Sequence, residues 1–592
     1  MIVPMKKIHL IAQKKDSDPT LNELRRLGVV HVEHEKVPVS AKIHRIKERS
    51  QTLVKAIEIF KKYEKKCACA PKKIEHCLEM SEAVVRQHTG IEEIKEDLSK
   101  RAPLISYWRK WGDFDPKDIL MLEEKHGIFI RLYEVPVKER DKLPGNVIAQ
   151  RVYLSKGIAG YVVISDRPQD IPLRGLPLPE YSLNEMIRLQ EKEKSRIIGL
   201  EKNIKEESAC HKCLAEYGDQ LRGELDFETV LRGLGEKEDL VFLKGFCPAD
   251  QLRGLTEKAK EEQWGILIED PTDADNIPTL LKNPKWVNII KPVFRFVDIL
   301  PGYKEVDASL IFLVFFSIFF GMLIGDAAYG LIFAAVTFFC QMKTAKKLKD
   351  RTIFYLLYTL SGCTVVWGLL TGTFFGQAWL TNKAAPLVPW LLEFNNIIFL
   401  CFLIGAVHLS IARFWQMVLR FPSITFLGQA GWVVIVWTVF FAAKMFVLNH
   451  AFPPYGACML ISGALMVIFF TEPIRNPLKV LVPRGLGFMM SLVNAFADVV
   501  SYIRLFAVGL ATVAIADAFN EMATGVGFNN VFTTMGAALI LIIGHVLNMV
   551  LAGLAVLVHG IRLNVLEFSG HLNLEWSGRR YTPFRRVEEN NS

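Results

Sequence analysis

The pattern of hydrophobic and polar positions divides the chain into two halves. Up to about Lys304 the apolar residues recur in short periods among many charges, whereas from about Ala308 to Gly570 long apolar runs follow one another. The pattern changes near Pro301, where we place a domain boundary. It predicts a charged cytoplasmic arm of residues 1–300, an all-α membrane domain of residues 301–576 and a basic tail of residues 577–592.

The first half carries two β-α-β-like patterns, in residues 5–32 and 240–269, which can share one lobe only if the intervening chain leaves and returns. Long charged helices are predicted near 40–66 and 181–221, and Ser182 with Glu185 has the spacing of a capping box. Strand patterns follow at 127–135, 147–154 and 158–165. We expect two α+β lobes at opposite ends of a long antiparallel helical, coiled-coil arm; a compact domain with long surface helices is the alternative. The expected parts are a proximal lobe (1–38 and 226–300), the arm (40–112 and 181–225) and a distal lobe (113–180).

The second half contains eight apolar runs to compare with the roughly 20 residues that a spanning helix needs. Lys and Arg gather after the second, fourth and sixth runs and almost vanish after the third, fifth and seventh, which obeys the positive-inside rule when all eight runs span. Both termini are then cytoplasmic. The last two runs exceed an upright span and are expected to be long and tilted. The runs are 308–323, 326–341, 353–377, 395–416, 428–449, 454–471, 486–522 and 533–570.

The cysteine content and the absence of certain motifs limit the cellular location, metal sites and enzymatic activities that the chain can have. The start of the chain has no apolar core with a cleavage site, so we expect no signal peptide and a reducing compartment for most of the ten cysteines. Two cysteine groups, Cys67/Cys69/Cys77 and Cys210/Cys213, could meet across paired helices, but their spacing matches no zinc module, and we predict no metal. No phosphate-binding P-loop occurs, so the chain is not expected to hydrolyse ATP by itself, and we predict no cofactor and no nucleic-acid partner.

One arginine stands near the middle of the seventh apolar run. Arg504 has no acid within a helical turn, and an arginine at the centre of a span costs roughly 2.5–3.5 kcal/mol, which makes it a functional candidate. The alternative is an arginine that extends to the headgroups or pairs with a neighbouring helix. The apolar run that contains Arg504 also has small residues at helical spacing. They indicate either close helix packing or a smooth surface past which another helix slides. They are Ala507, Ala511, Ala514 and Ala518.

The last apolar run carries a polar-to-small stripe. Its members recur at intervals of three and four residues, so they share one face of a helix that would otherwise meet lipid. One histidine there would be an ordinary packing residue, but four polar side chains on one face indicate a water- or proton-accessible lining. The stripe consists of His545, Asn548, Ala552, Ala555, His559 and Arg562.

Four segments resemble the membrane stator subunit of rotary V/A-type ATPases, called subunit a or subunit I. Two apolar segments, 501–511 (SYIRLFAVGLA) and 557–567 (LVHGIRLNVLE), and residues 581–584 (YTPF) are similar to its C-terminal signatures. Residues 320–330 (FGMLIGDAAYG) are similar to its motif between the first two spans. The resemblance covers the whole chain, including the two-lobed arm and eight spans.

The resemblance implies an ion-conducting role beside a rotating ring of proteolipid c subunits, each with a buried carboxylate. Arg504 would face those carboxylates, Arg562 would be the second arginine, and His559 and Glu567 would flank the latter. It further implies E/G-type peripheral stalk subunits on the cytoplasmic lobes, other rotary ATPase subunits and lipid as partners, and a prokaryotic plasma membrane. Some eukaryotic relatives have histidine where Thr512 stands and glutamate where Ala552 stands, so the resemblance does not define the external ion route here.

The physical chemistry agrees with this role. An arginine keeps its proton, so Arg504 cannot relay one, but it favours the ionised form of a passing carboxylate. Between two offset half-channels it would block a direct leak of protons or sodium ions. A secondary transporter with an intramembrane substrate site is the alternative, although such proteins usually show paired halves and interrupted helices. A membrane anchor or receptor with a docking arm is a third possibility.

Overall fold

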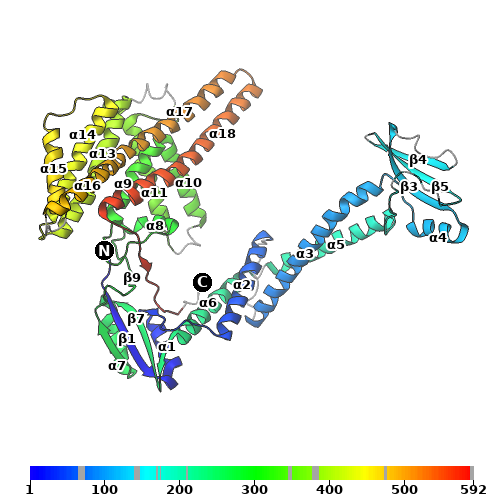
Figure 1. Ribbon diagram of the computed structural model, residues 1–592, viewed down its shortest axis with the longest axis horizontal. Helices are drawn as coiled ribbons and strands as arrows, with labels where there is room; N and C mark the ends of the chain where they lie inside the picture. The colour runs from blue at the N-terminus through cyan, green and yellow to red at the C-terminus, as the bar shows by residue number, and fades with distance from the viewer. Residues whose placement is uncertain are drawn as a thin grey trace. The chain divides into compact units, whose positions relative to one another are not determined.

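The computed structural model describes residues 1–63, 74–138, 147–155, 157–168, 171, 173, 175–208, 211–344, 350–376, 386–471 and 477–586, with backbone alone for 74–75, 211–213 and 477–482. The chain packs as two compact units. Unit 1 comprises Met1–Lys7, Phe246–Leu252 and Ile268–Thr582, and unit 2 comprises Ile8–Gly245, Arg253–Leu267 and Pro583–Ser592. Figure 1 draws the elements of both.

The N-terminal lobe is an α/β sheet whose strands alternate between two distant stretches of sequence. Its order is β2-β7-β1-β8, with β6 paired to β7, so strands from residues 5–33 are interleaved with strands from 235–269. Each stretch supplies only some of the strands, so the chain between them leaves the lobe after β2 and returns to it before β6. The sequence analysis required this path if the two stretches share one lobe. The elements are β1 (Met5–Gln13), α1 (Ser17–Leu27), β2 (His31–Glu33), β6 (Gly235–Lys237), β7 (Leu240–Pro248), α7 (Leu252–Glu261) and β8 (Gly265–Glu269).

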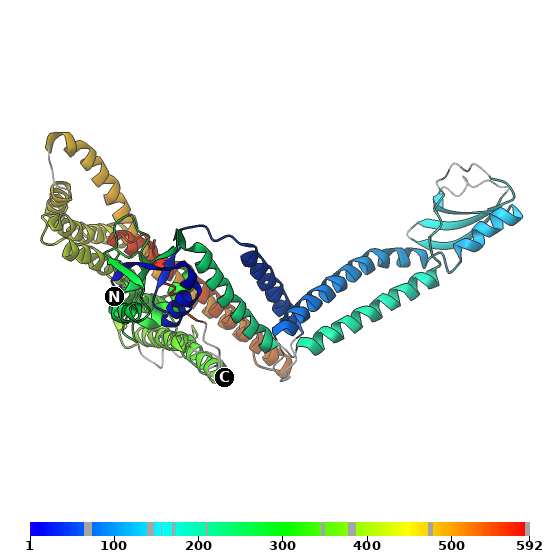
Figure 2. The same ribbon diagram turned by 90° about the horizontal axis from the view of Figure 1, so that it is seen from below.

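Long helices join this lobe to a second one. α2 (Ala41–Lys62) packs on α6 (His211–Gly233), and α3 (Ile74–Trp108) packs on α5 (Leu183–Glu207). Figures 1 and 2 show α3 and α5 side by side in both views. A shared apolar core, including Leu53, Phe60, Val84 and Leu214, holds these helices together. The paired helices agree with the predicted arm; coiled-coil packing within it stays a prediction.

The second lobe is a three-stranded antiparallel sheet with one helix. β3 (Phe129–Pro136), β4 (Ile148–Ser155) and β5 (Ile158–Ser165) are ordered β3-β5-β4, and α4 (Pro116–His126) precedes them. The chain then enters α5, where the Ser182 side chain accepts a hydrogen bond from the Glu185 backbone N–H. The Ser182 half of the predicted capping box is therefore present.

Unit 1 is a bundle of apolar helices around one central helix, α9. Eleven of the sixteen α9 residues are buried, including Phe312, Phe319 and Leu323, because α9 contacts α11, α17 and α18. A helix that is apolar all round is buried all round. The helices are α8 (Lys291–Val297), α9 (Ser309–Ile324), α10 (Ala327–Thr344), α11 (Thr352–Thr371), α13 (Phe394–Arg420), α14 (Phe426–Leu448), α15 (Gly456–Phe470), α16 (Pro477–Ser501), α17 (Ile503–Val526), α18 (Val531–Ala555) and α19 (Ser569–Leu572).

Six helical stretches of the described residues are long and apolar enough to cross a membrane. The remaining two predicted runs form shorter apolar helices, α9 and α15, so the count of eight spans stays a prediction. The last two stretches, Pro483–Val526 and Val531–Leu572, contain 44 and 42 residues. At 1.5 Å per residue each is about 65 Å long, more than twice the hydrocarbon thickness of about 30 Å. Their unusual length is therefore as the sequence indicated.

Close helix contacts in unit 1 depend on glycine. A Cβ placed on Gly509 of α17 would lie 2.6 Å from the carbonyl oxygen of Met322 on α9. On α9, Gly321 would place its Cβ 2.9 Å from the Cys363 carbonyl oxygen of α11. The backbones of α17, α9 and α11 therefore approach each other where side chains larger than hydrogen do not fit.

The C-terminal segment begins with an ordered strand. β10 (Arg579–Arg580) pairs in parallel with β9 (Pro278–Thr279), and the Tyr581 N–H donates to the Thr279 carbonyl. The predicted basic tail thus starts inside unit 1.

Candidate functional site

Arg504 lies on the first turn of α17, just after a break in the helix at Tyr502. The Tyr502 side chain is fully buried, and its hydroxyl group lies 2.8 Å from His408 Nδ1 on α13. The His408 ring stacks between Phe315, with centroids 3.9 Å apart, and Phe568, at 4.4 Å. This anchored tyrosine fixes where α17 begins and therefore where the guanidinium of Arg504 lies.

The guanidinium of Arg504 is half-buried. Among the residues that the structure describes, its buried Nη1 atom has no hydrogen-bond partner. Two charged side chains of the last helix, Arg562 and Glu567, lie within electrostatic range. A buried donor without a protein acceptor is costly, and it suits an acid presented from outside the chain.

Arg562 and Glu567 form an ion pair on the last helix. Arg562 Nε lies 3.6 Å from Glu567 Oε1, which also accepts a 2.8 Å hydrogen bond from the Ser501 hydroxyl at the end of α16. The Glu567 side chain is 5% exposed, whereas that of Arg562 is 53% exposed. The buried carboxylate therefore ties the two long helical stretches together, and the arginine stays accessible at the surface.

The helix around this pair is wider than an α-helix. Two π-helical segments, η7 (Val556–Gly560) and η8 (Leu563–Phe568), lie on either side of Arg562. Short π-helical turns occur frequently at functional sites. His559 lies in the first of them, within electrostatic range of Arg504 and Arg562, and its Nδ1 is buried without a partner among the described residues.

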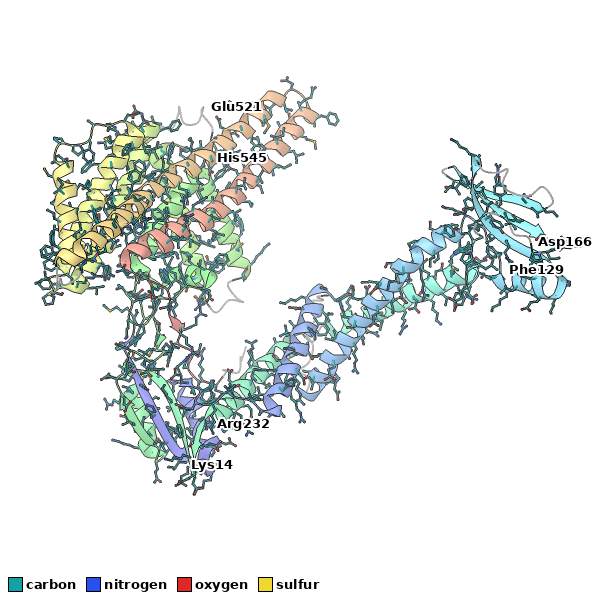
Figure 3. The ribbon with its side chains drawn as sticks, in the orientation of Figure 1. Lys14, Phe129, Asp166, Arg232, Glu521 and His545 are labelled. Carbon is teal, nitrogen blue, oxygen red and sulfur yellow. The ribbon has the colours of Figure 1, made fainter. Side chains whose placement is uncertain are left out.

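His545 and Asn548 belong to a second polar cluster. The Asn548 amide donates to the Tyr329 hydroxyl at 3.0 Å and to the Thr512 carbonyl at 2.7 Å, and Tyr329 lies 2.7 Å from His545 Nδ1. Figure 3 labels His545 on α18. The eleven residues from Asn548 to His559 separate the two clusters by about 16 Å along the helix. The structure therefore divides the six predicted site residues into two clusters, near Arg504 and near Tyr329.

Five of the six members of the stripe on the last helix are buried or half-buried, whereas Arg562 is exposed. Asn548 and Ala552 are buried, and His545, Ala555 and His559 are half-buried. In contrast to the buried members of that stripe, the four small residues predicted on one side of α17 are all exposed. They are Ala507, Ala511, Ala514 and Ala518.

Asp326 is a polar residue to which the sequence reasoning gave no role. It is 1% exposed and lies between α9 and α10, where it accepts hydrogen bonds from the backbone N–H groups of Ala328, Tyr329 and Gly376 at 2.8, 3.2 and 3.2 Å. The sequence could have pointed to Asp326, because an acidic residue beside an apolar run is unusual. Tyr329, which lies 216 and 219 residues before its partners His545 and Asn548 in the sequence, was also missed as a site residue.

The cysteines that were considered as zinc ligands lie mostly outside the described residues. Cys67, Cys69 and Cys210 fall there, and the side chain of Cys213 is not described. Cys77 is buried in the core of the long helices. Within the described ranges no group of three potential metal ligands occurs.

No protein-family model matches the chain. A curated relative, "V-type ATP synthase subunit I" of Borreliella burgdorferi, is 31% identical over 618 residues and covers both chains completely. The chain belongs to the V/A-type ATP synthase subunit I family.

Other subunit I proteins are similar as well. "V-type ATP synthase subunit I 1" of Treponema pallidum is 29% identical, covering 99% of this chain and 100% of the relative. "A-type ATP synthase subunit I" of Methanocaldococcus jannaschii is 26% identical over 60% of this chain and 56% of the relative. A crystal structure of the cytoplasmic N-terminal domain of a V-ATPase subunit I aligns with 44% of this chain and 99% of its own, at 13% identity. Its TM-score of 0.24 is too low to establish a common fold.

Proposed function

We propose that this subunit I is the membrane stator of a rotary V/A-type ATPase and forms the ion half-channels beside a rotating proteolipid ring. It does not hydrolyse ATP itself; it couples proton or sodium-ion movement to ATP hydrolysis or synthesis by other subunits. Family membership favours this function over the secondary transporter.

One observation carries the proposal: the side of α17 that follows Arg504 is smooth and exposed. The four exposed alanines leave room for a second helix to pass close by, and the unpartnered Nη1 of Arg504 supplies the donor that a ring carboxylate needs. A carboxylate beside this fixed positive charge stays ionised, because the charge favours the anionic form. An ionised acid cannot turn into lipid without a large desolvation cost. Ions would therefore load and unload on opposite sides of Arg504.

The flanking residues receive separate roles in this proposal. Arg562 and His559 extend the positive region beside Arg504, so that a cation cannot leak straight through. Glu567 orients Arg562 and, with Ser501, lines the route on one side. The cluster of Tyr329, His545 and Asn548, about 16 Å along α18, would line the half-channel on the other side.

The membrane topology and the cytoplasmic arm complete the proposed stator. The chain would cross a prokaryotic plasma membrane eight times with both termini in the cytoplasm. There the coiled-coil arm and its two lobes would bind E/G-type peripheral stalk subunits. The edge strand β4 supports such docking, because Ile148 and Leu154 are 69% and 56% exposed. Figure 3 labels Phe129 and Asp166 in the same lobe.

Two substitutions of Arg504 test the function in the reconstituted complex. We expect Arg504→Ala to abolish ATP-driven acidification of vesicles while assembly with the ring persists. Arg504→Lys keeps a charge but loses the planar fork and permanent protonation, and we expect it to pump poorly as well. Arg295→Lys, at an exposed arginine that pairs with Asp350, is the matched control and should pump normally. Acidification measured with and without sodium and a protonophore identifies the ion, and coupled pumping by Arg504→Ala would refute the assignment.

A further inference from the structure

A short helical segment precedes α9 in unit 1. A 3₁₀ turn, η5 (Asn288–Ile290), continues directly into α8 (Lys291–Val297). One side of this segment packs into the core of the helix bundle, where the ring of Phe294 meets that of Phe312 on the first turn of α9, with centroids 5.0 Å apart. The packed side chains are between 1% and 8% exposed, so the segment is a fixed part of the bundle. They are Val287, Ile290, Val293 and Phe294.

The remaining surface of the segment carries two exposed aromatic rings. Phe296 is 72% exposed, and Trp286, just before the segment, is 59% exposed. Single exposed apolar side chains are ordinary in proteins. Two large rings on one short and otherwise packed segment indicate instead a surface that something outside the chain covers.

The contacts of α8 place it at the edge of the membrane. α8 and η5 pack on α11 at one end of the helix bundle (Figure 1), and Arg295 forms an ion pair at 3.6 Å with Asp350, two residues before α11 begins. The 20 residues of α11 are about 30 Å long, which equals the hydrocarbon thickness of a bilayer, so α11 needs its whole length to cross. The first turn of α11 then lies at the edge of the hydrocarbon, and α8 beside it lies at the level of the lipid headgroups.

The headgroup layer is the environment that suits these rings. Tryptophan and tyrosine gather at that layer because it accepts an apolar ring and its polar edge together. The first turn of α11 exposes Ile353 at 43% and Tyr355 at 57%, so apolar and aromatic side chains are open on α8 and at the start of its neighbour alike. A protein partner would have to cover the start of a membrane helix together with the rings, whereas a bilayer covers both.

The rings, and not a net charge, decide this assignment. Lys291 and Arg295 both lie within electrostatic range of Asp350, so their positive charges are partly balanced. Lys285, next to Trp286, is exposed. These polar groups stay hydrated in the headgroup layer, which is wet, and none of them has to enter hydrocarbon.

We propose that α8 and Trp286 anchor unit 1 to the surface of the lipid bilayer. The rings of Trp286 and Phe296 enter the headgroup layer, while the other side of the segment stays packed on α9 and α11. The anchor fixes the height in the bilayer at which α9, the first apolar helix, begins. This inference rests on the membrane location of unit 1 and not on the role of Arg504.

Photo-crosslinking tests what the ring of Phe296 touches. Phe296 is replaced by p-benzoylphenylalanine in the full-length chain, which is reconstituted in phospholipid nanodiscs and, separately, assembled into the complete rotary complex. The same replacement at Phe338, 52% exposed on the candidate span α10, is the positive control, and that at Ile198, 67% exposed on α5, is the matched negative control. After illumination, mass spectrometry counts the phospholipid adducts. We expect at least about tenfold more adduct at Phe296 than at Ile198, because burial of a phenylalanine ring favours contact with lipid over water by at least this ratio.

A second measurement uses the intrinsic fluorescence of Trp286. The chain has eleven tryptophans, so the difference between the parent chain and Trp286→Phe reports on this one ring. Lipids brominated close to the headgroup should quench less fluorescence in Trp286→Phe than in the parent chain, and lipids brominated near the chain ends should show a smaller difference. Trp264→Phe, in the N-terminal lobe of unit 2, is the matched control and should leave the quenched fluorescence unchanged.

The outcomes separate a lipid surface from the alternatives. Adduct at Phe296 as rare as at Ile198, or equal quenching of the parent chain and Trp286→Phe, would overturn the proposal. Adduct with another subunit in the complete complex would also overturn it, in favour of a protein-binding surface. A larger difference with lipids brominated near the chain ends would overturn the placement in the headgroup layer. Trp286→Phe is a conservative change at an exposed position, so the quenching test decides the matter alone if the chain with p-benzoylphenylalanine does not fold.

Discussion

Gly509→Ala tests whether the position of Arg504 depends on close contact between α17 and α9. The new Cβ would lie 2.6 Å from the Met322 carbonyl oxygen, whereas ordinary contact begins at 3.4 Å, so the helices have to separate by about 0.8 Å. α9 cannot simply retreat, because Gly321 on α9 is itself close to the backbone of α11. Arg504 lies five residues from the new methyl group, and its guanidinium would move with α17.

The magnitude follows from two opposing effects. Overpacking of this kind costs about 1–3 kcal/mol, while replacing glycine by alanine inside a helix gains about 1 kcal/mol. Gly362→Ala on α11 provides the matched control, because a Cβ there meets no atom within 4 Å. We expect Gly509→Ala to lie about 1–3 kcal/mol below Gly362→Ala in unfolding free energy, measured by denaturant titration of the purified chain in mixed micelles.

The same two variants are compared for ATP-driven ion transport in the reconstituted complex. Transport should fall for Gly509→Ala and not for Gly362→Ala. Equal stability and equal transport of the two variants would refute the close α17–α9 contact as the support of Arg504.

Three further predictions concern single side chains. Ser182→Ala removes the cap of α5 and should lower the unfolding free energy of the arm by about 1 kcal/mol, measured by thermal unfolding of the full chain; an unchanged transition would show that the cap is dispensable. The pKa of Asp275 is held well below its usual range by the backbone and side chain of Thr272 and by Lys7, so its stabilising effect is present above the unfolded pKa and is lost as pH falls toward the folded pKa. Asp275→Asn should therefore destabilise the chain at neutral pH and make little difference in strong acid, and an equal effect at both pH values would contradict this. Glu567→Gln keeps the shape of the side chain but removes the charge beside Arg562, so we expect reduced ATP-driven transport with a nearly unchanged melting temperature; transport equal to that of the parent chain would exclude Glu567 from the ion route.

Local features of the fold were predictable because they depend on neighbouring residues. Ser182 and Glu185 are three positions apart, and the strands of the distal lobe follow from alternation and turns over a few residues. The interleaved order of the proximal sheet was not predictable in detail, since it depends on which distant strands pair. The short buried helix α9 shows the same limit, because apolar content alone does not distinguish a span from a helix surrounded by protein.

In the candidate site, too, some residues could be predicted from the sequence and others could not. Arg504, His559 and Arg562 stand out as charges or imidazoles in apolar runs. The 3,4 spacing places His545 to His559 on a side of the last helix that is at least half-buried, but it does not hold for Arg562, which is exposed. Tyr329 does not stand out, because a tyrosine in an apolar helix is ordinary and its partner His545 is 216 residues away. The sequence does not reveal His408 either. It anchors Tyr502 because it is stacked between rings from α9 and from the last helix, which are distant in the sequence.

The π-helical segments around Arg562 have a consequence for the rotational phase of the last helix. A π turn accommodates one more residue than an α turn, so two such segments delay the angular advance of everything that follows them. Arg562 is 53% exposed and Glu567 is 5% exposed, so the ion pair runs from the surface of the last helix to its buried side. A chain lacking one residue between Val556 and Gly560 could relax to a regular α-helix with its hydrogen bonds intact, and the side chains after the deletion would keep nearly the same direction, because a π turn and an α turn cover the same rotation with different numbers of residues. The last helix therefore carries an extra residue on either side of Arg562, and the contact between Glu567 and Ser501 should tolerate the loss of one residue before Arg562 better than the loss of one residue from a regular α-helix.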